Sequence, residues 1–205
     1  MMVFSLEKRS DETLMKLLSR GKEGAFDVLF RRHFHRLVSF FYRSIHDEEA
    51  SKDLAQEVFL KIFRASEKYE ERAKFTTWLF TIARNTLLNY FRDSKKTNHA
   101  VNGTIKEESL YEHRIERYPS TLPDPSDIAQ ARELGKIVEE AVDTLPESLK
   151  TPFVLSQVTG LSYQEISGVL GISTGAVKLR VFRAREMIIA IIGEKDLKPE
   201  GRNGV

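Results

Sequence analysis

Apolar residues recur at three- and four-residue steps along most of the chain, which is the pattern of amphipathic helices. No stretch shows the strict alternation that is typical of a half-buried strand. Residues 11–46 predict two or more helices, with Gly21 and Gly24 interrupting the first. The main apolar series in this part of the chain is Phe26, Leu29, Phe30, Phe34, Leu37 and Phe41. The pattern predicts an all-α fold.

Two more helices are predicted before the middle of the chain. Residues 47–69 place four apolar side chains on one stripe, namely Leu54, Val58, Ile62 and Phe63. A helix from Thr76 to Arg92 has a narrow core-facing arc formed by Leu79, Ile82, Ala83, Thr86 and Tyr90. Its outward arc holds Thr81, Arg84, Asn85, Leu88 and Arg92, flanked by Phe80, Asn89 and Phe91. Four helices of this size can bury a core, so a first domain is expected over residues 10–96.

The composition changes over residues 97–130, which are rich in charges and contain three prolines. Proline removes a backbone donor and biases the residue before it towards an extended conformation. This stretch is therefore predicted to be an irregular linker. Helical periodicity then resumes, predicting a second, smaller domain over residues 131–193 and a tail over 194–205. The expected architecture is two helical domains joined by the linker.

The strongest local motif lies in residues 161–186. Ser162 and Glu165 form a capping-box pattern that marks the start of a helix. Gly171 suits a left-handed helix end, and Ser173 or Thr174 can cap a second helix directly afterwards. Two short helices joined by a tight turn with glycine predict a helix-turn-helix. A plain helical hairpin within a bundle is the alternative.

The two faces of the second helix favour the first interpretation. The predicted core face consists of Val177, Val181, Ala184 and Ile188. The opposite face presents Leu179, Phe182, Arg183 and Glu186, with Lys178 and Arg185 on one flank and Arg180 on the other. A structural hairpin rarely exposes Leu and Phe among arginines. A recognition helix does so, because Arg reads guanine edges and apolar groups contact thymine methyls. We therefore predict that this helix reads duplex DNA.

The helix over 76–92, with Phe75 before it, is both aromatic and basic. Aromatic rings near Arg and Asn suit unstacked bases, which need stacking platforms and polar contacts to their edges. For Trp78, simple core packing explains the residue equally well. The preceding helix carries a polar stripe of Asp53, Gln56, Glu57 and Lys61, which is either a solvated face or an interface.

The net charge of +2 says little, but the basic residues are unevenly distributed. Residues 74–96 hold five basic side chains and one acid, and residues 172–193 hold four and one. Two basic segments far apart in the sequence could be two nucleic-acid contacts. Charge alone favours the alternative interpretation, in which they are two ordinary solvated helix faces.

Several kinds of chemistry are absent from the sequence. The chain has no cysteine, which excludes disulfides, thiol nucleophiles and cysteine-ligated metals. It has no glycine-rich phosphate loop, no H-E-x-x-H and no nucleophile elbow, and its five histidines lack ligand spacing. We expect no catalytic site, no metal and no cofactor. The longest apolar run, Met187 to Ile192, is too short to cross a bilayer and no export signal is visible, so a cytoplasmic protein without membrane insertion is expected.

Two blocks of sequence resemble a known family. DLAQEVFLKIFRA with FTTWLFTIARNTLLNYFRD resembles sigma region 2, and LPESLKTPFVLSQVTGLSYQEISGVLGISTGAVKLRVFRARE resembles sigma region 4. Their order and the length of the linker also match. The chain thus resembles an extracytoplasmic-function (ECF, group 4) sigma factor of the bacterial sigma-70 family.

This resemblance implies a non-enzymatic subunit that directs core RNA polymerase to promoter DNA. The family's polymerase contacts fall on Asp53, Gln56 and Glu57. Contacts to the melted −10 element fall on Phe75, Trp78, Arg84, Asn85, Asn89 and Arg92. Contacts to the −35 duplex fall on Lys178, Leu179, Phe182 and Arg183, although many relatives carry a small polar residue where Leu179 stands. The resemblance also implies a linker threading through the polymerase, and an inhibitory anti-sigma factor, which is often membrane-linked.

Two rival functions remain open at this point. A stand-alone helix-turn-helix transcriptional regulator would bind palindromic DNA unaided and would need a ligand pocket or a dimerisation helix. An adaptor or anti-regulator would bind proteins alone, and the basic Leu/Phe/Arg face argues against it. Gel shifts with the protein alone and then with core polymerase separate the three functions.

Overall fold

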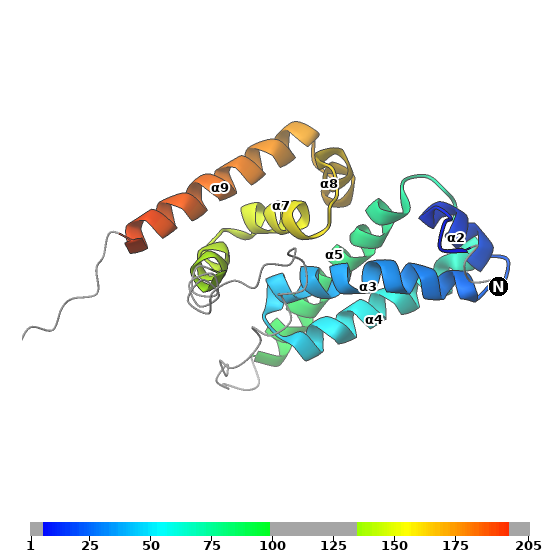
Figure 1. Ribbon diagram of the computed structural model, residues 1–205. Coiled ribbons are helices and arrows are strands. Elements are labelled where there is room, and N and C mark those ends of the chain that lie inside the picture. Colours follow the sequence, from blue (N-terminus) through cyan, green and yellow to red (C-terminus); the bar gives the residue numbers. More distant parts are fainter. Residues whose placement is uncertain (1–5, 99–134, 197–205) are drawn as a thin grey trace, which may run out of the picture. The chain divides into compact units, whose positions relative to one another are not determined.

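The computed structural model describes residues 6–98 and 135–196, and all regular structure within them is helical (Figure 1). In the first range the helices are α2 (Asp11–Leu18), α3 (Gly24–Ile45), α4 (Glu48–Ala65), the short 3-10 helix η1 (Ser66–Lys68) and α5 (Phe75–Asn98). In the second range they are α7 (Glu147–Val158), α8 (Tyr163–Leu170) and α9 (Thr174–Asp196), preceded by helical residues 135–143. The all-α prediction is confirmed. None of these helices is both long and apolar enough to span a bilayer.

The described residues form two compact units. The first contains those of Met1–Gly103 and Val154–Val177, and the second those of Thr104–Phe153 and Lys178–Val205. The predicted linker over 97–130 lies outside the described residues except for its first two positions, which belong to α5. Most of the predicted tail over 194–205 also lies outside them. The domain limits of 10–96 and 131–193 therefore stay predictions.

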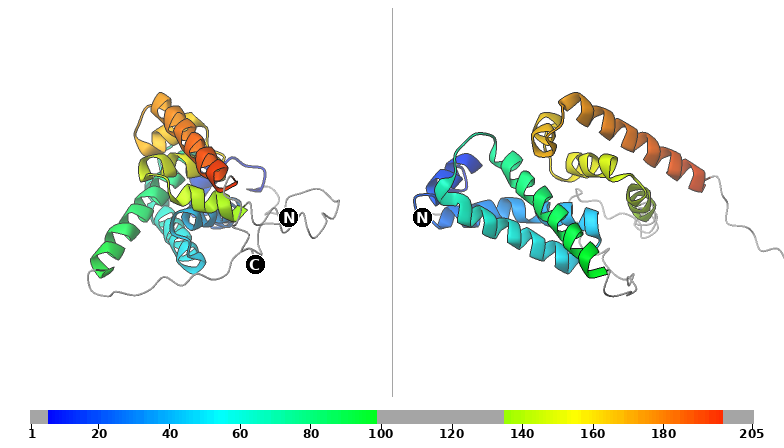
Figure 2. Two further views of the ribbon diagram at one scale, coloured as in Figure 1. Left: turned by 90° about the vertical axis from the view of Figure 1, so that its left-hand side faces the viewer. Right: turned by 180° about the vertical axis from the view of Figure 1, so that it is seen from behind.

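Helices α2 to α5 build the core of the first unit. α3 and α4 lie side by side along most of their lengths, and both views of Figure 2 show α5 beside this pair. The core is rich in aromatic rings, and burying such rings is a dominant favourable contribution to folding. The largest fully buried side chains here are Leu14, Met15, Leu29, Leu37, Phe40, Phe41, Phe59, Ile62, Phe75, Leu79 and Phe80.

The boundaries of these helices follow from their capping residues. The Ser10 hydroxyl accepts the Thr13 backbone N–H at 3.2 Å and starts α2. The Asp47 carboxylate accepts the Ala50 N–H at 2.9 Å and starts α4. Between them α3 ends at His46, whose φ of 54° is left-handed. Each cap satisfies a backbone group that has no partner within its own helix.

Two aromatic residues lie on faces that the sequence pattern assigned wrongly. Phe63, expected on the buried stripe of α4, is 46% exposed and contacts Phe26 edge-on at 5.4 Å between ring centroids. Phe80, expected at the margin of the outward arc of α5, is fully buried. It packs edge-on against Phe40 at 5.9 Å and beneath the guanidinium of Arg36. A helical wheel with one buried side places Phe80 outside the core. In the structure α5 packs against both α3 and α4, so it buries a wider part of its surface.

Candidate nucleic-acid interface

Three local features set where the helices of the helix-turn-helix motif begin and end. Ser162 and Glu165 form the predicted capping box: the Ser162 hydroxyl accepts the Glu165 N–H at 3.2 Å, and the Glu165 carboxylate accepts the Ser162 N–H at 2.8 Å. Burial raises the pKa of Glu165. Contacts that stabilise its ionised carboxylate, including the hydrogen bonds from Ser162, outweigh burial, so the pKa lies below its usual value. Gly171 ends α8 with a φ of 67°. The Ser173 hydroxyl accepts the Ala176 N–H at 3.1 Å, so Ser173 rather than Thr174 caps α9.

Helix α9 has the two faces that the sequence predicts. Its buried side consists of Val177, Val181, Ala184 and Ile188. Lys178, Leu179, Phe182 and Arg183 are all exposed on the other side. The exposed fractions of Leu179 and Phe182 are 49% and 58%, which is high for large apolar residues. The cations on this face are suited to contact phosphates or guanine edges, and its apolar side chains are suited to contact thymine methyl groups.

The start of α5 belongs to an aromatic cluster in which Trp78 and Tyr69 are both half-buried. Trp78 is half-buried, and its ring lies 5.3 Å from that of Tyr69 and 6.1 Å from that of Phe75. Phe75 is fully buried, so its ring supports Trp78 from within the core and presents no stacking surface. This placement corrects the expectation that Phe75 itself faces unstacked bases. Tyr69 was not singled out from the sequence, because one tyrosine in a charged segment carries no periodic signal.

The outward side of α5 carries the polar residues expected there. Asn85, Asn89 and Arg92 are exposed and follow one another at four- and three-residue steps, so they share a face. Arg84 is half-buried beside them. Leu88 is 47% exposed on the same side of the helix. The face offers amide and guanidinium groups for base edges and phosphates.

The polar stripe of α4 is exposed at all three predicted polymerase contacts, Asp53, Gln56 and Glu57. Glu57 pairs with Lys61 at 2.7 Å, and the Lys61 ammonium also donates to the Thr86 hydroxyl of α5 at 2.8 Å. A surface hollow of about 570 Å³ lies beside this bridge. It is lined by residues of both helices, among them Leu54, Glu57, Thr86, Asn89, Tyr90 and Arg92. The stripe of α4 and the outward face of α5 therefore meet at this hollow.

Two features escaped the sequence analysis. Leu60 and Phe63 of α4 are 53% and 46% exposed, one to two turns beyond the polar stripe. The second feature is a buried histidine, His33, which is hydrogen-bonded to Asp11. Pairs separated by 22 residues leave no periodic trace in one sequence. In the described ranges no three His, Asp or Glu side chains gather as a metal site would require.

Known protein families match both parts of the chain. The family model of Sigma-70 region 2 matches residues 29–97, and that of Sigma-70, region 4, matches residues 135–188. The RNA polymerase sigma-H factor of Pseudomonas aeruginosa is 31% identical, over 95% of this chain and 97% of its own. The ECF RNA polymerase sigma-E factor of Escherichia coli is 30% identical, over 89% of this chain and 94% of its own.

Solved structures agree with these matches. CnrH, in its complex with the cytosolic domain of CnrY, is 26% identical with a TM-score of 0.64, covering 91% of this chain and 99% of that one. The sigma factor RpoE of Bartonella quintana, bound to the anti-sigma factor NepR, shares the fold at 21% identity and a TM-score of 0.63, covering 82% and 96%. With relatives at 30% identity along almost its whole length, the chain belongs to the extracytoplasmic-function sigma factors of the sigma-70 family, which direct promoter-specific initiation by RNA polymerase.

Proposed function

We propose that two exposed surfaces of this sigma factor divide promoter recognition between them and that a third binds core polymerase. The observation that carries the proposal is the face of α9, where Leu179 and Phe182 stay exposed among basic side chains. In this proposal Lys178, Leu179, Phe182 and Arg183 read the −35 element in the major groove. Arg183 contacts a base edge, and the two apolar side chains select for thymine methyl groups.

The start and outward face of α5 capture the melted −10 element. Trp78 provides the stacking surface, with Phe75 packed behind it. Arg84, Asn85, Asn89 and Arg92 contact the edges and phosphates of the unstacked strand. Capturing a flipped base offsets the few kcal/mol that unstacking costs, which favours the open duplex.

The stripe of Asp53, Gln56 and Glu57 binds core polymerase. The exposed apolar side chains of Leu60 and Phe63 extend this surface along α4. Interfaces that combine a polar stripe with exposed apolar anchors are typical of protein–protein contacts. Free binding to promoters is weak in this scheme, because two small basic faces make few phosphate contacts. Once the sigma factor is docked on polymerase and one of its DNA-binding surfaces has bound, the other surface binds the same promoter in an intramolecular step.

An anti-sigma factor holds the protein inactive in the cytoplasm. Support comes from the two solved relatives, since CnrH is bound to the cytosolic domain of CnrY and the Bartonella RpoE to the anti-sigma factor NepR. The exposed apolar side chains Leu60 and Phe63 provide a surface for such a partner, in competition with polymerase. The protein supplies specificity and no turnover chemistry of its own.

Run-off transcription from a genomic library with core polymerase tests this function. Transcripts are expected that start at a shared promoter pattern and require the sigma factor. Gel shifts on the promoters so identified should give a specific complex with polymerase and sigma factor together, and none with sigma factor alone at the same concentration. Specific binding of the isolated protein to palindromic DNA would instead indicate a stand-alone regulator. Unchanged transcription in its presence would contradict the proposed function.

A further inference from the structure

Residues 69–74 join η1 to the start of α5 without regular helical structure. Residues 70–74 are all exposed, and the segment ends four residues before Trp78. Its path therefore depends on side chains that reach it from elsewhere in the fold. In the proposed function this segment borders the place where an unstacked −10 base is captured.

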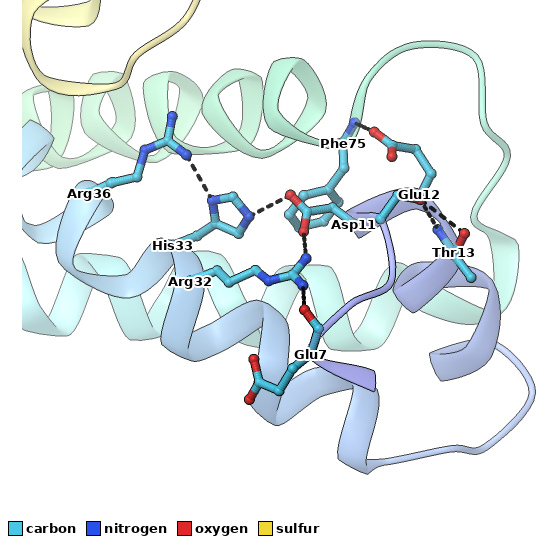
Figure 3. A network of polar contacts seen from close by, with 9 residues as sticks. Glu7, Asp11, Glu12, Thr13, Arg32, His33, Arg36 and Phe75 are labelled. Carbon is cyan, nitrogen blue, oxygen red and sulfur yellow. Dashed lines mark hydrogen bonds and ion pairs between the residues drawn. The ribbon is translucent and has the colours of Figure 1, made fainter. Parts of the chain in front are cut away.

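Glu12 of α2 contacts the point where this segment enters α5. One oxygen of its carboxylate accepts the backbone N–H of Phe75 at 2.9 Å, across 63 residues of sequence (Figure 3). Phe75 is the first residue of α5, so its N–H has no partner within that helix. A carboxylate here also opposes the positive end of the helix dipole. Glu12 thus caps α5 from a different helix.

A second contact from α2 reaches the middle of the segment. Lys16, one turn after Glu12, pairs with Glu71 at 2.6 Å, although both side chains are exposed and such a pair alone contributes little. Tyr69, at the start of the segment, lies with its ring against Trp78. Its hydroxyl is buried without a hydrogen-bond partner among the described residues. Burial and the nearby carboxylates of Glu12, Glu71 and Asp11 raise the pKa of Tyr69 to about 12, so the phenol stays neutral.

Helix α2 is itself fixed on α3, as Figure 3 shows. The Asp11 carboxylate accepts from Arg32 at 2.6 Å and lies 2.7 Å from Nε2 of His33. Arg36 donates to the other ring nitrogen of His33 at 3.3 Å. The His33 ring also lies 5.4 Å from that of Phe75. These contacts hold α2, and with it Glu12, against α3.

We propose that Glu12 is a positioning residue for promoter melting. By capping α5 it fixes the start of that helix and the approach of residues 69–74. Trp78 is then already in position to stack on an unstacked base before DNA binds. The inference rests on the proposed −10 function of α5, and it adds α2, which precedes the residues 29–97 matched by the region 2 family model. Two substitutions test this role. Glu12→Ala removes the cap, whereas Glu12→Gln keeps an oxygen that can accept the Phe75 N–H.

The test compares full-length variants with core polymerase on two templates. One is a duplex promoter identified by run-off transcription, and the other is the same promoter with its −10 element unpaired beforehand. Glu12→Ala should lower open-complex formation on the duplex on the order of fivefold, the size of a lost side-chain cap. On the unpaired template it should stay within about twofold of wild type, and Glu12→Gln should stay near wild type on both. Glu7→Ala, which removes an exposed ion pair with Arg31 of α3, is the matched control and should change neither.

Fluorescence gives a second reading that a general loss of stability would not mimic. Trp78 is the only tryptophan of the chain, so its emission reports on this cluster alone. Under conditions where all variants are folded, Glu12→Ala should shift the emission to longer wavelength and Glu12→Gln should not. Equal losses on both templates, weakened polymerase binding, or no loss on the duplex would each overturn the inference. Absence of transcription by the wild type on either template would instead contradict the proposed function.

Discussion

The imidazole of His33 lies 2.7 Å from the carboxylate of Asp11, and the histidine is almost fully buried. Arg32 holds the other carboxylate oxygen at 2.6 Å. Burial raises the pKa of Asp11, but His33 and Arg32 outweigh it, so the pKa lies below the usual value for aspartate. The ionised carboxylate therefore favours the folded chain, because its pKa is lower there than in the unfolded state.

Asp11→Asn should lower the free energy of unfolding by about 1.5–3 kcal/mol at pH 7, the typical range for a hydrogen bond to a charged group. This contribution is fully present above the ordinary aspartate pKa of about 4 and is lost as the pH falls through the lower folded-state value. Urea unfolding of wild type and variant at several pH values measures the difference, which should shrink in acid. Asp27→Asn, at an exposed position on α3, is the control. A difference that does not change with pH would contradict the assignment.

Two glycines near the turn of the helix-turn-helix should respond in opposite directions to the same change. Gly171 has a φ of 67° and open space around it, so Gly171→Ala introduces backbone strain of about 1–2 kcal/mol without a clash. Gly175 is the second residue of α9 and has no left-handed φ, and the nearest neighbour to an added Cβ is the Ser173 hydroxyl at 3.9 Å. Gly175→Ala should therefore stabilise by up to about 1 kcal/mol. Thermal unfolding of the two variants distinguishes the signs.

Arg183→Ala should weaken promoter binding by about 1–3 kcal/mol and relax selectivity at one −35 position. Binding of the polymerase holoenzyme to a set of promoters with single substitutions in the −35 element measures both effects. Arg185→Ala, at an exposed position on the flank of the same helix, is the comparison. A uniform loss across all sequences would make Arg183 a phosphate contact and not a reader of bases.

Glu57→Lys should abolish binding to core polymerase while the fold stays intact, because Glu57 is exposed and its partner Lys61 is also bonded to Thr86. Co-purification with core polymerase measures binding, and circular dichroism checks the helices. Asp27→Lys makes the same charge change on the exposed side of α3 and should leave binding unchanged. If Glu57→Lys co-purifies as well as wild type, the stripe on α4 does not bind polymerase.

Much of this architecture could be predicted because its determinants are local. The capping box at Ser162, the left-handed end at Gly171 and the two faces of α9 each depend on residues within a few positions of one another. Phe75 and Phe80 were misassigned because their burial depends on α3, far away in the sequence. The same reason hid the cap from Glu12, since nothing in the order of residues indicates that a carboxylate 63 positions earlier meets that N–H.

The bridge formed by Lys61 has a mechanical consequence. Its ammonium touches the polar stripe of α4 through Glu57 and the buried middle of α5 through Thr86. In the proposed function, this bridge therefore links the helix that binds core polymerase, α4, to the helix that captures the separated strand, α5. Under that proposal, a shift of α4 on the polymerase surface would be passed on to α5, so the choice of start site would depend on how the sigma factor docks.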